Sequence, residues 1–146
     1  MPKRPQLVRS GSRARYSPSR DIVEVPQERR FKEPEEFYST LFHELSHATG
    51  HTSRLNRPGL MELSRFGSYS YSKEELVAEM GAAYLCGHAG IENAVIDNSA
   101  AYINSWLSRL KKDKTLIVQA ASQAQKAADY ILGKQFDGAA PRETTR

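Results

Sequence analysis

The sequence contains a single cysteine, Cys86, among its 146 residues. One cysteine forms neither an internal disulfide nor a cysteine-based zinc site, so any metal site must use imidazole and carboxylate ligands. No apolar run approaches the roughly 18 residues that a membrane-spanning helix needs, and the basic first 15 residues lack the apolar segment of a secretory signal. These absences exclude the membrane and secreted classes, and we expect a single cytoplasmic domain.

Acidic residues are absent from the first 20 positions, which include six lysines and arginines. The other 126 residues carry 15 basic and 17 acidic side chains, so the formal net charge of +4 originates at the N-terminus. A basic segment with few apolar residues buries too little surface to offset its ordering entropy. We therefore expect residues 1–15 to form a flexible basic arm, either a solvated tail or a weak nucleic-acid contact. The basic residues are Lys3, Arg4, Arg9, Arg13, Arg15 and Arg20.

The remaining sequence predicts a few strands followed by helices. A β-branched run over residues 21–25, ended by Pro26, is typical of a strand at a sheet edge, and a second strand is expected near Val8 or residues 14–16. Apolar residues at helical spacing predict four helices. These span residues 33–49, closed by Gly50; residues 72–89; a third segment from Asn98 or Ser99; and a fourth from an Asp113 cap to Gly133.

A long loop over residues 51–70 separates the first two predicted helices, and residues 134–146 form a polar tail. The expected organisation is therefore an α+β domain over residues 16–133, mainly helical, between the basic arm and the tail.

His43-Glu44-Leu45-Ser46-His47 is an HExxH motif within the first predicted helix. Residues four apart lie one above the other on a helix, so both imidazoles can reach one small ion. Neutral imidazole is a good zinc ligand at neutral pH. Glu44 lies one step around the helix, where its carboxylate can take a proton from a water on the metal. We predict that His43 and His47 bind Zn²⁺ and that Glu44 is the general base; the alternative is two solvent-facing histidines.

A catalytic zinc site needs a third protein ligand. The longer HExxHxxGxxH motif fails because Ser53 stands where its third histidine belongs, and His51 would need an unusual turn to bind the metal. The second predicted helix offers Glu74, Glu75 and Glu79, of which Glu75 and Glu79 share one face. Glu75 is the predicted ligand because it begins a Glu-x-x-Ala-acid pattern resembling that of gluzincins, in which the second acid orients a histidine. The alternatives are Glu79 as the ligand, and Glu75 closing a capping box with Ser72.

Three runs of the sequence resemble one known domain. They are FYSTLFHELSHATGHTSRLNR, YSKEELVAEMGAAYLCGHAGI and NSAAYINSWLSRLKKDKTLIVQAASQAQKAADYIL. They resemble the C-terminal zincin-like metallopeptidase domain of ArdC-type antirestriction proteins, which also occurs in phage and plasmid polyvalent proteins and in TraC-type primases. The resemblance covers residues 14–133 and implies a zincin-like fold, with a small N-terminal sheet over the HExxH helix. It supports His43 and His47 as ligands and Glu44 as the base.

The resemblance also bears on partners. In that family a separate N-terminal domain binds single-stranded DNA, and the whole protein is thought to protect incoming plasmid DNA from host restriction. That domain is expected to be absent from this chain or to be supplied by a separate polypeptide.

The sequence thus predicts zinc-dependent hydrolysis of a peptide or protein substrate, with the strand over residues 21–25 pairing with an extended substrate. The alternative is a non-catalytic antirestriction module that binds DNA or protein on a zincin scaffold. Arg54 and Arg57 are expected to brace the loop by ion pairing or to bind a substrate carboxylate. Cys86 is expected in the core. Four further side chains are candidates for stabilising an oxyanion: Tyr69, Tyr71, His51 and His88.

Overall fold

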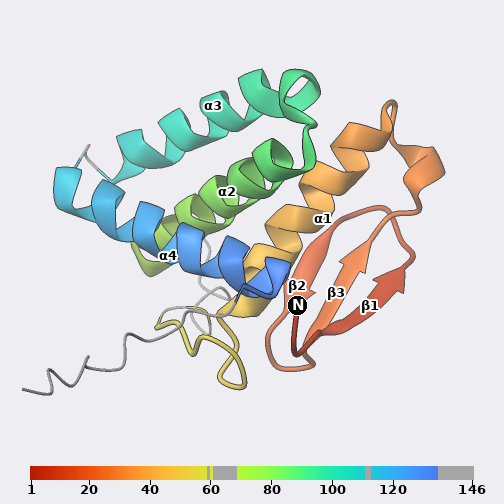
Figure 1. Ribbon diagram of the computed structural model, residues 1–146, viewed down its shortest axis with the longest axis horizontal. Coiled ribbons are helices and arrows are strands. Elements are labelled where there is room, and N and C mark those ends of the chain that lie inside the picture. Colours follow the sequence, from red (N-terminus) through yellow and green to blue (C-terminus); the bar gives the residue numbers. More distant parts are fainter. Residues whose placement is uncertain (59, 61–68, 111–112, 135–146) are drawn as a thin grey trace, which may run out of the picture.

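Three short strands precede four helices in the computed structural model (Figure 1). The model describes residues 1–58, 60, 69–110 and 113–134, and the side chains of these residues except 69, 92–96 and 98. The centre of the predicted loop and the predicted tail beyond residue 134 lie outside this range. The elements are β1 (Gln6–Arg9), β2 (Arg15–Ser17), β3 (Ile22–Val25), the 3-10 turn η1 (Glu28–Arg30), α1 (Pro34–Thr49), α2 (Tyr69–Ala89), α3 (Glu92–Arg109) and α4 (Lys114–Leu132).

The strands form one sheet in the order β1-β3-β2, in which β3 pairs parallel to β1 and antiparallel to β2. The predicted strand over residues 21–25 is therefore present, but its predicted edge position is wrong because both edges of β3 are paired. For the same reason β3 cannot add a substrate strand. Val23 and Val25 are fully buried and point from β3 into the core.

Residues 1–15 were predicted to form a flexible arm, but residues 6–9 of this segment form the strand β1. β1 is polar and mostly exposed, and it aligns Gln6 with Ile22 and Arg9 with Val25. Its order comes from backbone hydrogen bonds to the buried β3 and from the Arg9 guanidinium, which lies 5.6 Å from the centre of the Phe37 ring. Composition alone carries no signal for such tertiary pairing.

Local signals set most of the helix ends. α1 begins at Pro34 and is followed by Gly50, and the Asp113 side chain accepts hydrogen bonds from the backbone N–H groups of Thr115 and Leu116 at the start of α4. Gly133 ends α4 with φ of 69°, a left-handed conformation that glycine adopts without strain.

Two predicted helix starts are wrong. α2 begins at Tyr69, so Ser72 is buried inside the helix and does not cap it. The capping box would have used the Glu75 carboxylate, which is thereby left for other contacts. α3 begins at Glu92, well before the predicted start at Asn98 or Ser99.

The core has two parts, one between the sheet and α1 and the other among α2, α3 and α4. In the first, the sheet packs on α1 around Val23, Val25 and Phe37. In the second, α2 packs on α4 and the end of α3 around Leu76, Leu110 and Ala124. This arrangement fixes α1 between the sheet and α2. None of the helices in the described part of the chain combines the length and apolar character that crossing a bilayer requires.

Gly81 lets α2 approach α1 closely. A Cβ atom added there would lie 2.6 Å from Ser46 Oγ and 3.1 Å from Ser46 Cβ, and Ser46 is fully buried on α1. We expect Gly81→Ala to lower the free energy of unfolding by about 1–3 kcal/mol in urea titrations. Gly87→Ala is the control, because Gly87 is exposed on the same helix and alanine should stabilise it by about 0.5–1 kcal/mol. Equal stabilisation by both variants would show that the helices are not this close.

Candidate metal centre

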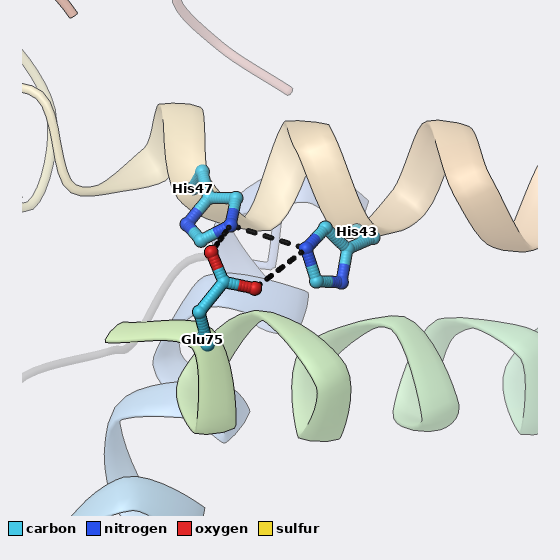
Figure 2. A group of neighbouring side chains, drawn as sticks. All are labelled: His43, His47 and Glu75. Carbon is cyan, nitrogen blue, oxygen red and sulfur yellow. Dashed lines mark hydrogen bonds and ion pairs between the residues drawn. The ribbon is translucent and has the colours of Figure 1, made fainter. Parts of the chain in front are cut away.

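Three side chains from α1 and α2 bring their donor atoms together (Figure 2). The Nε2 atoms of His43 and His47 lie 3.1 Å apart, one helical turn from each other on α1. Glu75 of α2 places one carboxylate oxygen 3.4 Å from His43 Nε2 and the other 3.4 Å from His47 Nε2. All three side chains are largely buried, with exposed fractions of 17% for His43, 4% for His47 and 13% for Glu75.

This donor set fits a tetrahedral metal ion. Zinc binds histidine nitrogen and carboxylate oxygen at about 2.0–2.2 Å, so two ligand atoms in a tetrahedral site lie about 3.3–3.5 Å apart. The two Nε2 atoms are 3.1 Å apart, and each lies 3.4 Å from a different oxygen of Glu75. With one donor atom taken from each residue, all three lie within 4.8 Å of one another. Two imidazoles and one carboxylate leave one position of a tetrahedron open, as in catalytic zinc sites.

A second carboxylate faces the far nitrogen of each imidazole. Glu79 lies 3.3 Å from His43 Nδ1, and Glu74 lies 3.3 Å from His47 Nδ1. A carboxylate that accepts a hydrogen bond from Nδ1–H fixes the tautomer in which Nε2 is free to bind a metal. The same hydrogen bond makes Nε2 a stronger metal ligand. Glu75 and Glu79 therefore face different nitrogens, an arrangement that favours Glu75 as the third donor and Glu79 as the partner of His43.

Glu74 is held by Arg57, and both side chains are almost fully buried, at 3% and 7% exposed. The Arg57 guanidinium donates to both Glu74 oxygens, at 2.8 and 2.5 Å. It also donates to the backbone oxygen of Ser46 and to the hydroxyl of Thr49, near the C-terminal end of α1. Burial alone would raise the pKa of Glu74, but the hydrogen bonds from Arg57 and His47 outweigh burial and hold the pKa below its usual value.

The electrostatics of the cluster favour added positive charge. Burial lowers the histidine pKa values, but the surrounding carboxylates outweigh it and raise the pKa of His43 to about 10 and that of His47 to about 9. For His43 the main contributors are Glu75 and Glu79. The pKa of Glu75 is lowered, because its bonds to the two histidines outweigh the effect of burial. A divalent cation would supply the same charge as the two bound protons.

Glu44 lies next to His43 on α1 and is 8% exposed. Burial raises its pKa, and the two histidines and the backbone N–H of Tyr16 in β2 act in the opposite direction. The contact with Tyr16 places Glu44 between the two histidines and the sheet.

A family model of zincin-like metallopeptidases matches residues 3–123. The chain belongs to the zincin-like metallopeptidase family. The match confirms the predicted zincin-like α+β fold, with four helices and a small three-stranded sheet.

The relatives of this zincin-like domain are longer proteins. The chain is 39% identical over 128 residues to the uncharacterized protein y4eC of Sinorhizobium fredii, covering 87% of this chain and 40% of that protein. It is 39% identical over 124 residues to DNA primase TraC of Escherichia coli, covering 84% of this chain and 8% of the primase.

Solved structures of longer proteins also match this chain. The Mn(II)-bound crystal structure of the antirestriction protein ArdC from plasmid R388 matches with 44% identity and a TM-score of 0.70. This match covers 88% of the chain and 47% of ArdC. The metal-free ArdC structure matches with a TM-score of 0.66 over 45% of its chain. The predicted resemblance to the ArdC-type domain is thus confirmed, and the chain spans less than half the length of each of these relatives.

The other predicted site residues fall outside the donor cluster of this zincin-like domain. His51 contacts Ser53, with Nδ1 2.9 Å from Oγ, and His88 is exposed near the end of α2. Tyr71 packs its ring against Trp106 and hydrogen-bonds Glu75; burial is the first cause that raises its pKa, to about 12. The side chain of Tyr69 lies outside the described residues.

Arg54 and Arg57 form ion pairs within the protein, which is one of the two roles predicted for them. Arg54 forms an ion pair and hydrogen bonds with Asp21 just before β3, and it donates to the backbone oxygen of Ala48. Arg57 pairs with Glu74 as described above. Cys86 is buried, in agreement with the expected core position.

A cavity of about 450 Å³ adjoins the donor cluster. It lies between α1, α2 and α3. Its described lining is Phe31, Glu36, Ser39, Thr40, His43, Glu75, Glu79, Ser99, Tyr102 and Trp106. The cavity thus adjoins two of the three donor residues, His43 and Glu75.

Proposed function

We propose that this zincin-like domain is a zinc-dependent peptidase in which His43, His47 and Glu75 bind the metal and Glu44 is the general base. The observation that carries this proposal is the convergence of two imidazole nitrogens and the Glu75 carboxylate, with donor atoms within 4.8 Å of one another, beside the buried Glu44. The family match agrees with this chemistry.

A metal ion held by these three residues would polarise a peptide carbonyl and acidify water at its open position. Glu44 would take the proton of the attacking water and return it to the nitrogen of the leaving amine. Glu79 and Glu74 would hold the two imidazoles in the tautomer that leaves Nε2 free. Tyr71 lies beside Glu75 and would help to position a substrate.

Zinc is the metal we propose, because two imidazoles and one carboxylate form a common catalytic zinc set. The related ArdC was crystallised with Mn(II), so manganese is the competing ion. We expect one zinc per chain by plasma mass spectrometry of the purified protein. His43→Ala and Glu75→Ala should lower this stoichiometry to near zero, whereas Glu79→Ala should bind zinc about 10–100-fold more weakly without losing the site.

Three results would contradict this assignment. Zinc lost in Glu79→Ala but kept in Glu75→Ala would make Glu79 the ligand. If the reconstituted protein binds no zinc but one manganese ion per chain, manganese is the metal of this site. If the protein binds neither metal while its circular dichroism is unchanged, it is not a metallopeptidase.

The names of the relatives suggest a setting for the activity. We propose a cytoplasmic role in plasmid or phage antirestriction, with a protein substrate and with single-stranded DNA bound by a separate domain or polypeptide. The alternative is a non-catalytic binding module, favoured by the exposed basic side chains before β1 and between the strands, such as Arg4, Arg13 and Arg20. Salt-sensitive DNA binding that Glu44→Gln leaves unchanged, together with no peptide cleavage, would favour this alternative.

A further inference from the structure

We infer that the cavity beside the donor cluster is a specificity subsite that accepts a lysine or arginine side chain of a peptide substrate. This inference rests on the proposed peptidase function and adds the class of substrate. It is carried by the length of the cavity, its aromatic walls and its charge.

The cavity extends away from the donor cluster along α1. His43 lies at one end of its α1 wall, and Glu36 lies seven residues earlier, with Thr40 and Ser39 between them. Seven helical residues span about 10 Å. A substrate whose scissile bond lies at the donor cluster would therefore need a long side chain to reach Glu36.

The walls suit the aliphatic part of such a side chain. Phe31, Tyr102 and Trp106 contribute aromatic rings to the lining. The Arg109 guanidinium already lies 4.8 Å from the centre of the Trp106 ring, whereas Tyr102 is 58% exposed and offers a free ring. Lysine and arginine pack their methylene groups on apolar surfaces and are attracted to aromatic faces through their charge.

The charge of the cavity selects against acidic side chains. Its described lining includes the carboxylates of Glu36, Glu75 and Glu79 and contains no lysine or arginine. Glu75 and Glu79 face His43. Glu36 accepts a hydrogen bond from the backbone N–H of Lys32, and it forms no ion pair with any residue in the described part of the chain. Its carboxylate is thus the group that would meet a cationic side chain at the far end.

Binding to the zinc-loaded Glu44→Gln protein tests the inference without cleavage. The probes are three fluorescein-labelled decapeptides that differ at one central position, which is lysine, norleucine or glutamate. Fluorescence anisotropy should show the lysine peptide binding about tenfold more tightly than the norleucine peptide, and the glutamate peptide binding most weakly.

Substitutions then assign the preference to Glu36. Adding Glu36→Gln should bring the affinities for the lysine and norleucine peptides together, and adding Glu36→Lys should favour the glutamate peptide. Glu35→Gln is the matched control, because it removes the same charge from the same turn of α1 outside the described lining of the cavity. The control should keep the preference for lysine.

Equal affinities for the three peptides, no detectable binding of any of them, or a lysine preference that survives Glu36→Gln would overturn the inference. Failure of the proposed function gives a different result. In that case the lysine preference would appear in anisotropy, while the zinc-loaded wild-type protein would leave a peptide mixture with a randomised central position uncut in mass spectrometry.

Discussion

Glu44→Gln is expected to lower the rate of peptide cleavage by about 10²–10⁴-fold while the protein still binds one zinc per chain. Glutamine has nearly the same shape as glutamate but cannot take a proton from the attacking water. Glu44 is buried beside the two histidines and contributes no atom to the donor cluster, so metal binding should not depend on its charge. Cleavage of a peptide mixture by mass spectrometry and metal content measure the two effects separately.

Glu35→Gln on the same helix is the control for this variant and should keep full cleavage. Wild-type cleavage rates in Glu44→Gln would exclude Glu44 as the base. Loss of zinc in Glu44→Gln would instead indicate that the carboxylate holds the metal site together.

Arg57→Gln is expected to have the largest effect on stability. The substitution removes the guanidinium that donates to both oxygens of the buried Glu74 carboxylate and leaves His47 as its one ion-pair partner in the described part of the chain, and breaking a buried ion pair on one side costs about 3–5 kcal/mol. His47 would also lose the fixed carboxylate at Nδ1, so zinc affinity should fall about 10–100-fold. Urea unfolding of the metal-free protein and competition with a zinc chelator measure the two quantities.

A double-mutant cycle separates these effects from general damage. Arg57→Gln combined with Glu74→Gln removes both charges and should be more stable than Arg57→Gln alone, because no unpaired charge remains. Zinc affinity should stay low in the double variant, since His47 then has no Glu74 carboxylate at Nδ1. Arg13→Gln, at an exposed position, should change neither quantity. Additive losses of stability in the double variant would show that Arg57 and Glu74 do not interact.

Sequence reasoning reached the features that depend on local signals. Pro34, Gly50, Asp113 and Gly133 mark helix ends because each acts within one turn of its own position. The four-residue spacing of the HExxH motif likewise places two imidazoles on one helix face, and in the structure their Nε2 atoms lie together.

The features that sequence reasoning missed depend on tertiary contacts. β1 is ordered by pairing with a strand 16 positions away, and its composition gives no sign of this. Ser72 and Glu75 have the spacing of a capping box, but Glu75 faces the histidines and the helix begins earlier. Glu74 was named among the acids of this helix, but its spacing gave no sign of its contact with His47.

The role of Arg57 could be anticipated only in part. An arginine in a loop usually forms a weak ion pair at the surface, and Arg57 lies 17 positions before Glu74 in the sequence. Burial turns this pair into a support for His47, and burial of a loop residue is set by the packing of the whole domain. The signal available in the sequence was the pair of adjacent acids Glu74 and Glu75 in the second helix.

Anomalous diffraction at the zinc absorption edge, on crystals of the zinc-loaded protein, tests the central claim most directly. The account predicts one strong peak about 2.0–2.2 Å from the Nε2 atoms of His43 and His47 and from one oxygen of Glu75. A peak bound by Glu79 in place of Glu75, or no peak between α1 and α2, would contradict it.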